Sequence, residues 1–241
     1  MTPVAHRSGA HADLANAELL DISIPYSSGT PGWPGDVAFS CGWTARREDG
    51  SSVNLGAITT STHAGTHADA PLHVHSAWGA SESLDVTAFV GECAVIVLPE
   101  SMVPDAAISV VQLQSLIRSQ IASQIAATHP DVSHVPARVL LCTGHSVAMG
   151  TFPAAWPVLE EQTADWLIAN GVRLVGTDAP SVDARDSKIL PVHHCLFRGG
   201  AYVLENVALS GISPGRYELL AQPLAIVGAD AAPVRALLRR L

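Results

Sequence analysis

The stretch Thr62-His-Ala-Gly-Thr-His-Ala-Asp-Ala-Pro-Leu-His-Val-His75 carries four histidines and one aspartate in this chain of 241 residues. In a fully extended strand, at about 3.3 Å per residue, His63 and Asp69 would lie roughly 20 Å apart and could not bind one ion. Ligands converge on a metal ion at bond lengths of about 2.0 to 2.2 Å, so the chain must coil here. Gly65 allows an unusual backbone conformation and Pro71 fixes the exit. The stretch therefore predicts a coiled, metal-binding segment.

The spacing within the stretch indicates how its side chains would meet. A helical turn across His63 and His67 would place both imidazoles on one face, with Asp69 reaching round from the following turn. Imidazole and carboxylate ligands together favour zinc, manganese or iron over calcium or magnesium. A solvated histidine-rich loop and a histidine cluster at the end of a strand are the alternative interpretations.

A second cluster, Val192-His-His-Cys-Leu196, strengthens the metal interpretation. Glu205 follows it, on a predicted strand that is otherwise apolar at Tyr202, Val203 and Leu204. A glutamate in such a strand requires a partner. A metal ion and a buried arginine such as Arg198 satisfy this requirement equally well.

The composition limits the classes of function. The chain has 22 acidic and 13 basic residues, a formal net charge of −9, which argues against a nucleic-acid or anionic-membrane partner. Only 15% of residues are charged and 48% are hydrophobic, so a large core is expected. No run of about 18 apolar residues predicts a transmembrane helix. The four cysteines form no C-x-x-C pair, which predicts free thiols in a soluble, cytoplasmic protein.

Apolar periodicity predicts a mixed α/β class with much antiparallel sheet, in a single domain over 18–241 after a flexible tail over 1–17. Period-two alternation predicts a strand over 37–46 with one buried face, and a neighbouring strand over 53–60. Helices are predicted over 109–127 and about 162–170, the latter followed by a strand over 172–177. Pro233 is predicted to open a basic C-terminal helix.

The motif His63-x-Gly-Thr-His67-x-Asp69-Ala-Pro-x-His73 resembles that of the cyclase-like metal hydrolase family, whose bacterial members include kynurenine formamidases. The similarity extends from about Leu20 onward. It includes Asp21-Ile-Ser23, Thr30-Pro-Gly-Trp-Pro-Gly-Asp36, Arg138-Val-Leu-Leu141, Gly171-Val-Arg-Leu-Val-Gly176, Asp178-Ala-Pro-Ser-Val-Asp183, Ser187-Lys188, His193-His194, Leu204-Glu205 and Pro233-Val-Arg235.

The resemblance implies a swivelling β/β/α fold with a mixed, largely antiparallel sheet, and a homodimer or higher homo-oligomer. It also implies two zinc ions per subunit. The reaction implied is zinc-dependent hydrolysis of the small molecule N-formyl-L-kynurenine to L-kynurenine and formate, in tryptophan catabolism.

Position by position, the resemblance assigns His63, His67 and Asp69 to the first zinc ion. Asp69 would bridge to a second zinc ion held by His193 and Glu205.

Two further residues receive roles from the resemblance. His73 would be the general acid/base, and Trp33 would line the substrate pocket. Without the resemblance, Trp33 fits core packing and a ring-stacking surface equally well.

Three rival functions follow from other features. Residues 139–148 look like a strand leading into a nucleophile elbow, with Ser146, Asp178 and His193 in the order of a serine hydrolase. The glycine and prolines at 150, 153 and 157 oppose it, because the elbow serine should open a helix. The second rival is a metal hydrolase of another cyclic or aryl amide, such as isatin, with one manganese ion. Glu205 argues against a single ion, because it would give a second ion a carboxylate ligand of its own. A non-enzymatic metal-storage module is the third.

Overall fold

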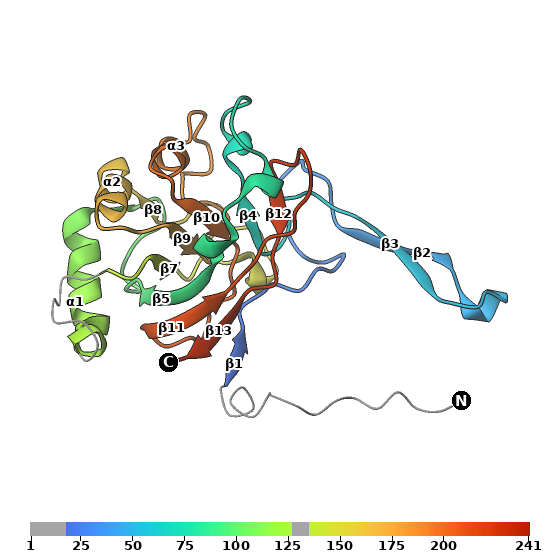
Figure 1. Cartoon of the computed structure of the whole chain (residues 1–241), viewed down its shortest axis with the longest axis horizontal. Helices are drawn as coiled ribbons and strands as arrows, with labels where there is room; N and C mark the ends of the chain where they lie inside the picture. Colours follow the sequence, from blue (N-terminus) through green and yellow to red (C-terminus); the bar gives the residue numbers. More distant parts are fainter. Residues whose placement is uncertain (1–17, 127–134) are drawn as a thin grey trace.

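The computed structural model describes residues 18–126 and 135–241. The predicted flexible tail over 1–17 lies outside the described residues. Within them, the centre of the fold is a nine-stranded sheet in the order β1-β13-β11-β5-β7-β9-β10-β4-β12 (Figure 1). Its strands are β1 (Leu19–Asp21), β13 (Leu237–Arg240), β11 (Gly215–Leu220), β5 (Val90–Val97), β7 (Arg138–Cys142), β9 (Leu174–Thr177), β10 (Tyr202–Glu205), β4 (His67–Asp69) and β12 (Ala231–Pro233).

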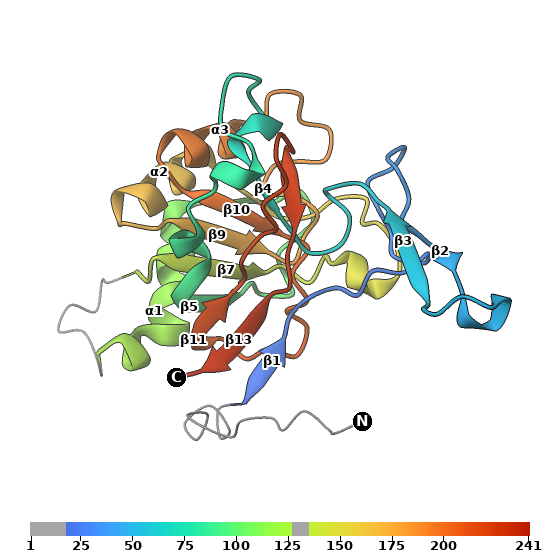
Figure 2. The same cartoon turned by 45° about the vertical axis from the view of Figure 1, so that its right-hand side comes forward.

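The sheet is mixed. The central strands β5, β7, β9 and β10 pair in parallel, and the flanking strands pair antiparallel. Three α-helices lie along one side of this sheet: α1 (Val110–Ala126), α2 (Glu161–Ala169) and α3 (Pro191–Arg198) (Figure 2). The shorter elements are β2 (Ser40–Ala45), β3 (Leu55–Thr59), β6 (Ala107–Ile108), β8 (Val158–Leu159) and the 3₁₀ turns η1 (Arg47–Asp49), η2 (Pro71–His73), η3 (Ser81–Ser83), η4 (Val86–Phe89) and η5 (Val147–Met149). The predicted mixed α/β class and its largely antiparallel pairing are confirmed.

Both faces of the central strands are buried. On β7, Val139 and Leu141 belong to the core cluster beneath the helices, whereas Leu140 belongs to the cluster on the opposite face. Side chains of a strand alternate between its two faces, so a strand covered on both sides reads as a continuous apolar run. The helices predicted over 109–127 and 162–170 are confirmed as α1 and α2.

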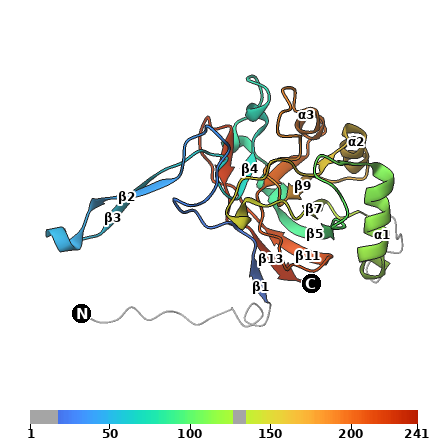
Figure 3. The ribbon, with the colours of Figure 1, turned by 180° about the vertical axis from the view of Figure 1, so that it is seen from behind.

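The buried face predicted over 37–46 is wrong. Strands β2 and β3 pair only with each other and form a hairpin that projects from the body of the molecule (Figure 3). Trp43 is 56% exposed and Ile58 is 65% exposed. Alternation identifies an apolar strand face, but it does not show that a second layer covers that face.

The predicted C-terminal helix is also wrong. The segment forms β12 and β13, and β13 lies between β1 and β11. Val234, Ala236 and Leu238 are buried at every second position, while Arg235 pairs with Asp21 at the surface. This period of two belongs to a strand, and it overrides the helix-opening preference of the proline.

Among the described residues, no helix combines the length and the apolar character needed to cross a membrane.

Candidate active site

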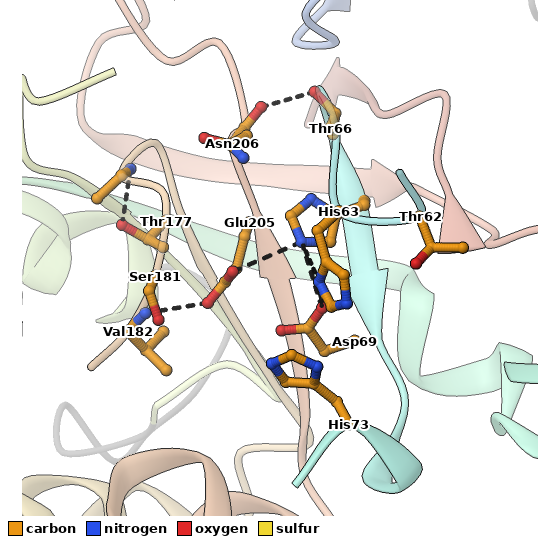
Figure 4. Close-up of polar contacts among 12 residues, drawn as sticks. Thr62, His63, Thr66, Asp69, His73, Thr177, Ser181, Val182, Glu205 and Asn206 are labelled. Carbon is orange, nitrogen blue, oxygen red and sulfur yellow. Dashed lines mark hydrogen bonds and ion pairs between the residues drawn. The ribbon is translucent and has the colours of Figure 1, made fainter. Parts of the chain in front are cut away.

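Strand pairing brings the central acidic residues together. In the antiparallel pair of β10 with β4, Glu205 lies opposite His67 and Val203 lies opposite Asp69. His67 and Asp69 are two residues apart, so they share one face of β4 with the directly opposed Glu205. All three are buried, and Figure 4 shows the side chains of Asp69 and Glu205 close to each other beside His63.

The chain enters β4 through a tight turn at Gly65. This residue has a φ of +59°, and a Cβ placed there would lie 3.2 Å from the ring of Tyr26. A side chain would therefore be strained and crowded, which confirms the predicted role of the glycine. His63 and His67 meet across this turn and the start of β4, so the predicted helical turn across them is wrong.

Each of three imidazoles has one nitrogen fixed by an acceptor outside the cluster. His63 Nε2 donates to Asp230 Oδ2 at 2.9 Å, and His67 Nδ1 donates to the carbonyl oxygen of Gly65 at 2.9 Å. His193 Nδ1 donates to Asp183 Oδ2 at 2.7 Å. Because the acceptors cannot donate, these contacts leave His63 Nδ1, His67 Nε2 and His193 Nε2 facing the cluster.

The free nitrogens face the two oxygens of Asp69. Oδ1 lies 3.0 Å from His63 Nδ1 and 3.2 Å from His67 Nε2, and Oδ2 lies 3.0 Å from His193 Nε2. Glu205 adds Oε1 at 3.4 Å from His193 Nε2 and Oε2 at 3.6 Å from His67 Nε2.

This arrangement fits a divalent metal ion. Asp69 Oδ1 is fully buried and has no hydrogen-bond partner among the described residues, although two imidazole nitrogens lie close to it. Lone pairs that face one another at this distance repel unless a metal ion or a proton lies between them. One ligand atom each from His67, Asp69 and Glu205 lies within 4.8 Å of the others, as does one each from His63, Asp69 and His73. Imidazole with carboxylate is the donor set of zinc and other transition-metal ions.

Ionisation within the cluster follows the same contacts. Burial disfavours the charged form of His63, yet Asp69 and Asp230 outweigh it and raise the pKa of His63 to about 10. Burial likewise disfavours the charged form of His193, but its hydrogen bonds to Asp183 and Asp69 raise its pKa well above the ordinary value. Burial opposes the ionisation of Asp69, but the positive charges of the neighbouring imidazoles lower its pKa. A metal ion and protons would therefore compete for the same nitrogens.

Asp183 organises the start of α3. Its Oδ1 accepts the backbone N–H of Val192 at 3.0 Å, and its Oδ2 accepts the backbone N–H of His193 at 3.1 Å, besides the imidazole contact. One carboxylate thus satisfies two of the free N–H groups at the helix start and sets the orientation of His193. Asp183 ends one of the segments that resemble the family, 178–183, but no role is predicted for it from the sequence.

Sequence reasoning missed Asp230. Its Oδ2 lies 2.9 Å from His63 Nε2 and 3.5 Å from His73 Nδ1, and its Oδ1 accepts the hydroxyl of Thr62 at 2.9 Å. It precedes β12, which pairs with β4 and so brings this distant residue to the histidine stretch. No local motif marks it.

A cavity of about 360 Å³ opens onto the cluster, lined by His63, His67, His73 and Glu205 among others. Trp33 also lines it, is 38% exposed, and packs edge-on against Phe152 at 5.2 Å between ring centroids. Trp33 also lies edge-on against the buried Trp156 at 6.0 Å. The cavity thus has the polar residues of the cluster at its base and an aromatic wall formed by Trp33 and Phe152. Its volume lies in the range of small-molecule binding sites.

The serine-hydrolase arrangement is not assembled. The Ser146 hydroxyl accepts the backbone N–H of Ala148, and Asp178 accepts N–H groups from Thr143 and Gly144. Among the described residues, His193 has its polar contacts with the metal-site carboxylates and Asp183.

The arginine alternative for Glu205 also fails. Arg198 lies exposed at the end of α3, while Glu205 accepts the backbone N–H of Val182 at 3.0 Å.

Comparison with known proteins agrees with this site. The family model named Cyclase matches residues 20–184, so the chain belongs to the cyclase family. The kynurenine formamidase of Salinibacter ruber is 44% identical over 223 residues, covering 92% of this chain and 97% of that protein. The kynurenine formamidase of Bordetella avium is 38% identical, with 92% of this chain and 98% of that protein covered.

Solved structures share the fold. A structure described as a potential metal-dependent hydrolase with cyclase activity has a TM-score of 0.70 at 28% identity, covering 93% of this chain and 98% of that one. An isatin hydrolase bound to the product analogue thioisatinate has a TM-score of 0.74 at 21% identity and 95% coverage of both chains, a likeness of fold alone. Together with the formamidase relatives, these similarities identify the protein as a hydrolase and confirm the predicted cyclase-like fold.

Proposed function

We propose that this protein hydrolyses N-formyl-L-kynurenine to L-kynurenine and formate, using divalent zinc. The observation that carries the proposal is the convergence of three imidazole nitrogens on the buried carboxylates of Asp69 and Glu205, at the floor of a cavity with an aromatic wall. The choice of substrate rests on relatives named kynurenine formamidase, which are similar to this chain over nearly their whole length.

The donor atoms fall into two sets that share Asp69. His63 Nδ1 and His67 Nε2 face Asp69 Oδ1, and they would hold one ion. His193 Nε2 lies 3.0 Å from Asp69 Oδ2 and 3.4 Å from Glu205 Oε1, and these three residues would hold a second. When bound, such ions lower the pKa of water toward 7 and polarise a carbonyl oxygen.

The remaining residues would orient the substrate and move protons. Trp33 offers a ring face and edge against which the aryl group of the substrate can pack. His73 lines the cavity, with Asp230 beside its Nδ1. As general acid/base, it would accept a proton from the attacking water and return it to the departing aniline nitrogen, because amide cleavage requires a protonated amine as leaving group.

A substrate panel tests the proposal. We expect kcat/KM of the zinc- or manganese-loaded protein to be highest for N-formyl-L-kynurenine, with simple aryl formamides next and isatin lowest. Formate release measures the first two, and ring opening monitored by absorbance measures the third. Preference for isatin, or no hydrolysis of any formamide, would contradict the proposed substrate.

We further propose that residues 18–241 act as a single domain, in the cytoplasm. The support is that β1 and β13, from opposite ends of the chain, are adjacent in one sheet. The four cysteines are free thiols in the structure, a state that a reducing compartment maintains.

A homo-oligomer is proposed from the hairpin of β2 and β3. Its large apolar side chains Trp43, Leu55 and Ile58 are each more than half exposed in the single chain. An isolated two-stranded hairpin is only marginally stable in water, and contiguous exposed apolar surface marks an interaction site. A second copy of the chain would cover it.

Sedimentation velocity checks this proposal. The wild-type protein should sediment as a dimer or larger species, and the double variant Trp43→Ser/Ile58→Ser should dissociate, because the apolar surface that drives association is reduced. Val103→Ser, at another exposed apolar position outside the hairpin, is the matched control and should stay associated. A monomeric wild-type protein would contradict the proposal.

A further inference from the structure

Two basic side chains line the cavity outside the metal-ligand cluster. Arg185 and Lys188 both contribute to its lining and are exposed, three residues apart on the segment between β9 and α3. Lys188 is the only lysine in a chain whose net charge is −9. The metal-site residues and these two cations therefore face one cavity.

Neither cation has an acidic partner in the part of the chain that the structure describes. Other arginines of the described residues form ion pairs with carboxylates: these are Arg46, Arg173, Arg216, Arg235, Arg239 and Arg240. Within residues 18–126 and 135–241, no ion pair involves Arg185 or Lys188. In an acidic protein, two cations without carboxylate partners at one cavity create a local attraction for anions.

Arg185 is held against the aromatic wall. Its guanidinium carbon lies 5.6 Å from the centroid of the Phe152 ring, and its Nη1 donates to the carbonyl oxygen of Ala154 at 3.4 Å. Phe152 in turn packs against Trp33. A ligand whose ring lies beside Trp33 would thus have a guanidinium within the same lining, with N–H donors that suit a carboxylate.

We propose that Arg185 and Lys188 form a carboxylate subsite for the part of the substrate that extends beyond its aryl ring. The inference rests on the proposed function and deepens it. The subsite makes the enzyme selective for aryl formamides that carry an anionic group over neutral aryl formamides with the same reacting bond. Arg185 supplies paired N–H donors, and Lys188 supplies a point charge.

The test compares two substrates, N-formyl-L-kynurenine and the neutral N-(2-acetylphenyl)formamide. Lys188→Met and Arg185→Met should each lower kcat/KM for the charged substrate by about tenfold or more, because a hydrogen bond between charged groups is lost. The loss should appear mainly in KM, since the carboxylate lies away from the bond that reacts. The neutral substrate should be hydrolysed at the wild-type rate, which also shows that the variants fold.

Arg118→Met is the matched control, because Arg118 is exposed on α1 and outside the cavity lining. It should leave both substrates unchanged. An equal loss for both substrates in the Lys188 and Arg185 variants, or no loss for the charged one, would overturn the carboxylate subsite. Failure of the wild-type protein to hydrolyse either formamide would instead overturn the proposed function.

Discussion

Replacing Asp69 by asparagine should abolish metal binding and lower kcat for N-formyl-L-kynurenine by at least about a thousandfold, since several kcal/mol of metal-derived stabilisation would be lost. Asp69 is the centre of the cluster because its two oxygens face three imidazole nitrogens at 3.0 to 3.2 Å. Asparagine has nearly the same shape, but it offers one oxygen and directs an N–H₂ group at nitrogens or a metal ion. It therefore removes the charge and one ligand atom without leaving a cavity.

The measurement pairs steady-state kinetics with metal content per chain by mass spectrometry. Asp85→Asn is the matched control, because Asp85 is a surface aspartate paired with Arg173 and lies outside the cavity lining. It should retain wild-type metal content and turnover. Asp69→Asn with activity within tenfold of wild type would remove Asp69 from the proposed metal site.

His73→Ala should keep the metal and lose turnover. General acid/base catalysis contributes about a hundredfold to ten-thousandfold, so kcat should fall by that amount. His73 lines the cavity, with its ring centroid 4.3 Å from that of His63 and its Nδ1 3.5 Å from Asp230. The closest contacts of Asp69 are with His63, His67 and His193, so the proposed metal ligands should stay in place when the His73 side chain is removed.

Metal content decides between two roles for this residue. His73 also lies within reach of His63 and Asp69 as a third ligand. Loss of metal together with activity in His73→Ala would identify His73 as a ligand and contradict the acid/base assignment. His75→Ala is the control, because this exposed imidazole stacks on Trp78 at 4.7 Å and should change neither quantity.

The sequence predicted most of the candidate site because its residues lie in short, chemically unusual stretches. The density of histidines over 62–75 required a coiled chain, and the left-handed backbone at Gly65 provides it. Glu205 was conspicuous in an apolar strand, and the register of β10 with β4 sets it opposite His67. Such signals are local, so they can be read without knowledge of the fold.

The parts that sequence reasoning missed depend on contacts between distant segments. Asp230 reaches His63 only because β12 adds to the edge of β4, and no pattern around Asp230 encodes that pairing. The exposed faces of β2 and β3 look like buried strand faces because alternation does not reveal what lies opposite. At the C-terminus, the buried alternation of Val234, Ala236 and Leu238 in the sheet prevailed over a proline that favours a helix start.

The central claim is that catalysis requires metal ions held by the cluster around Asp69. The most direct test strips the protein exhaustively with a chelator, adds zinc in steps, and measures bound metal and formate release from N-formyl-L-kynurenine in the same samples. The stripped protein should be inactive, and activity should rise with bound zinc and saturate at two ions per chain. Full activity in the metal-free protein would contradict the account.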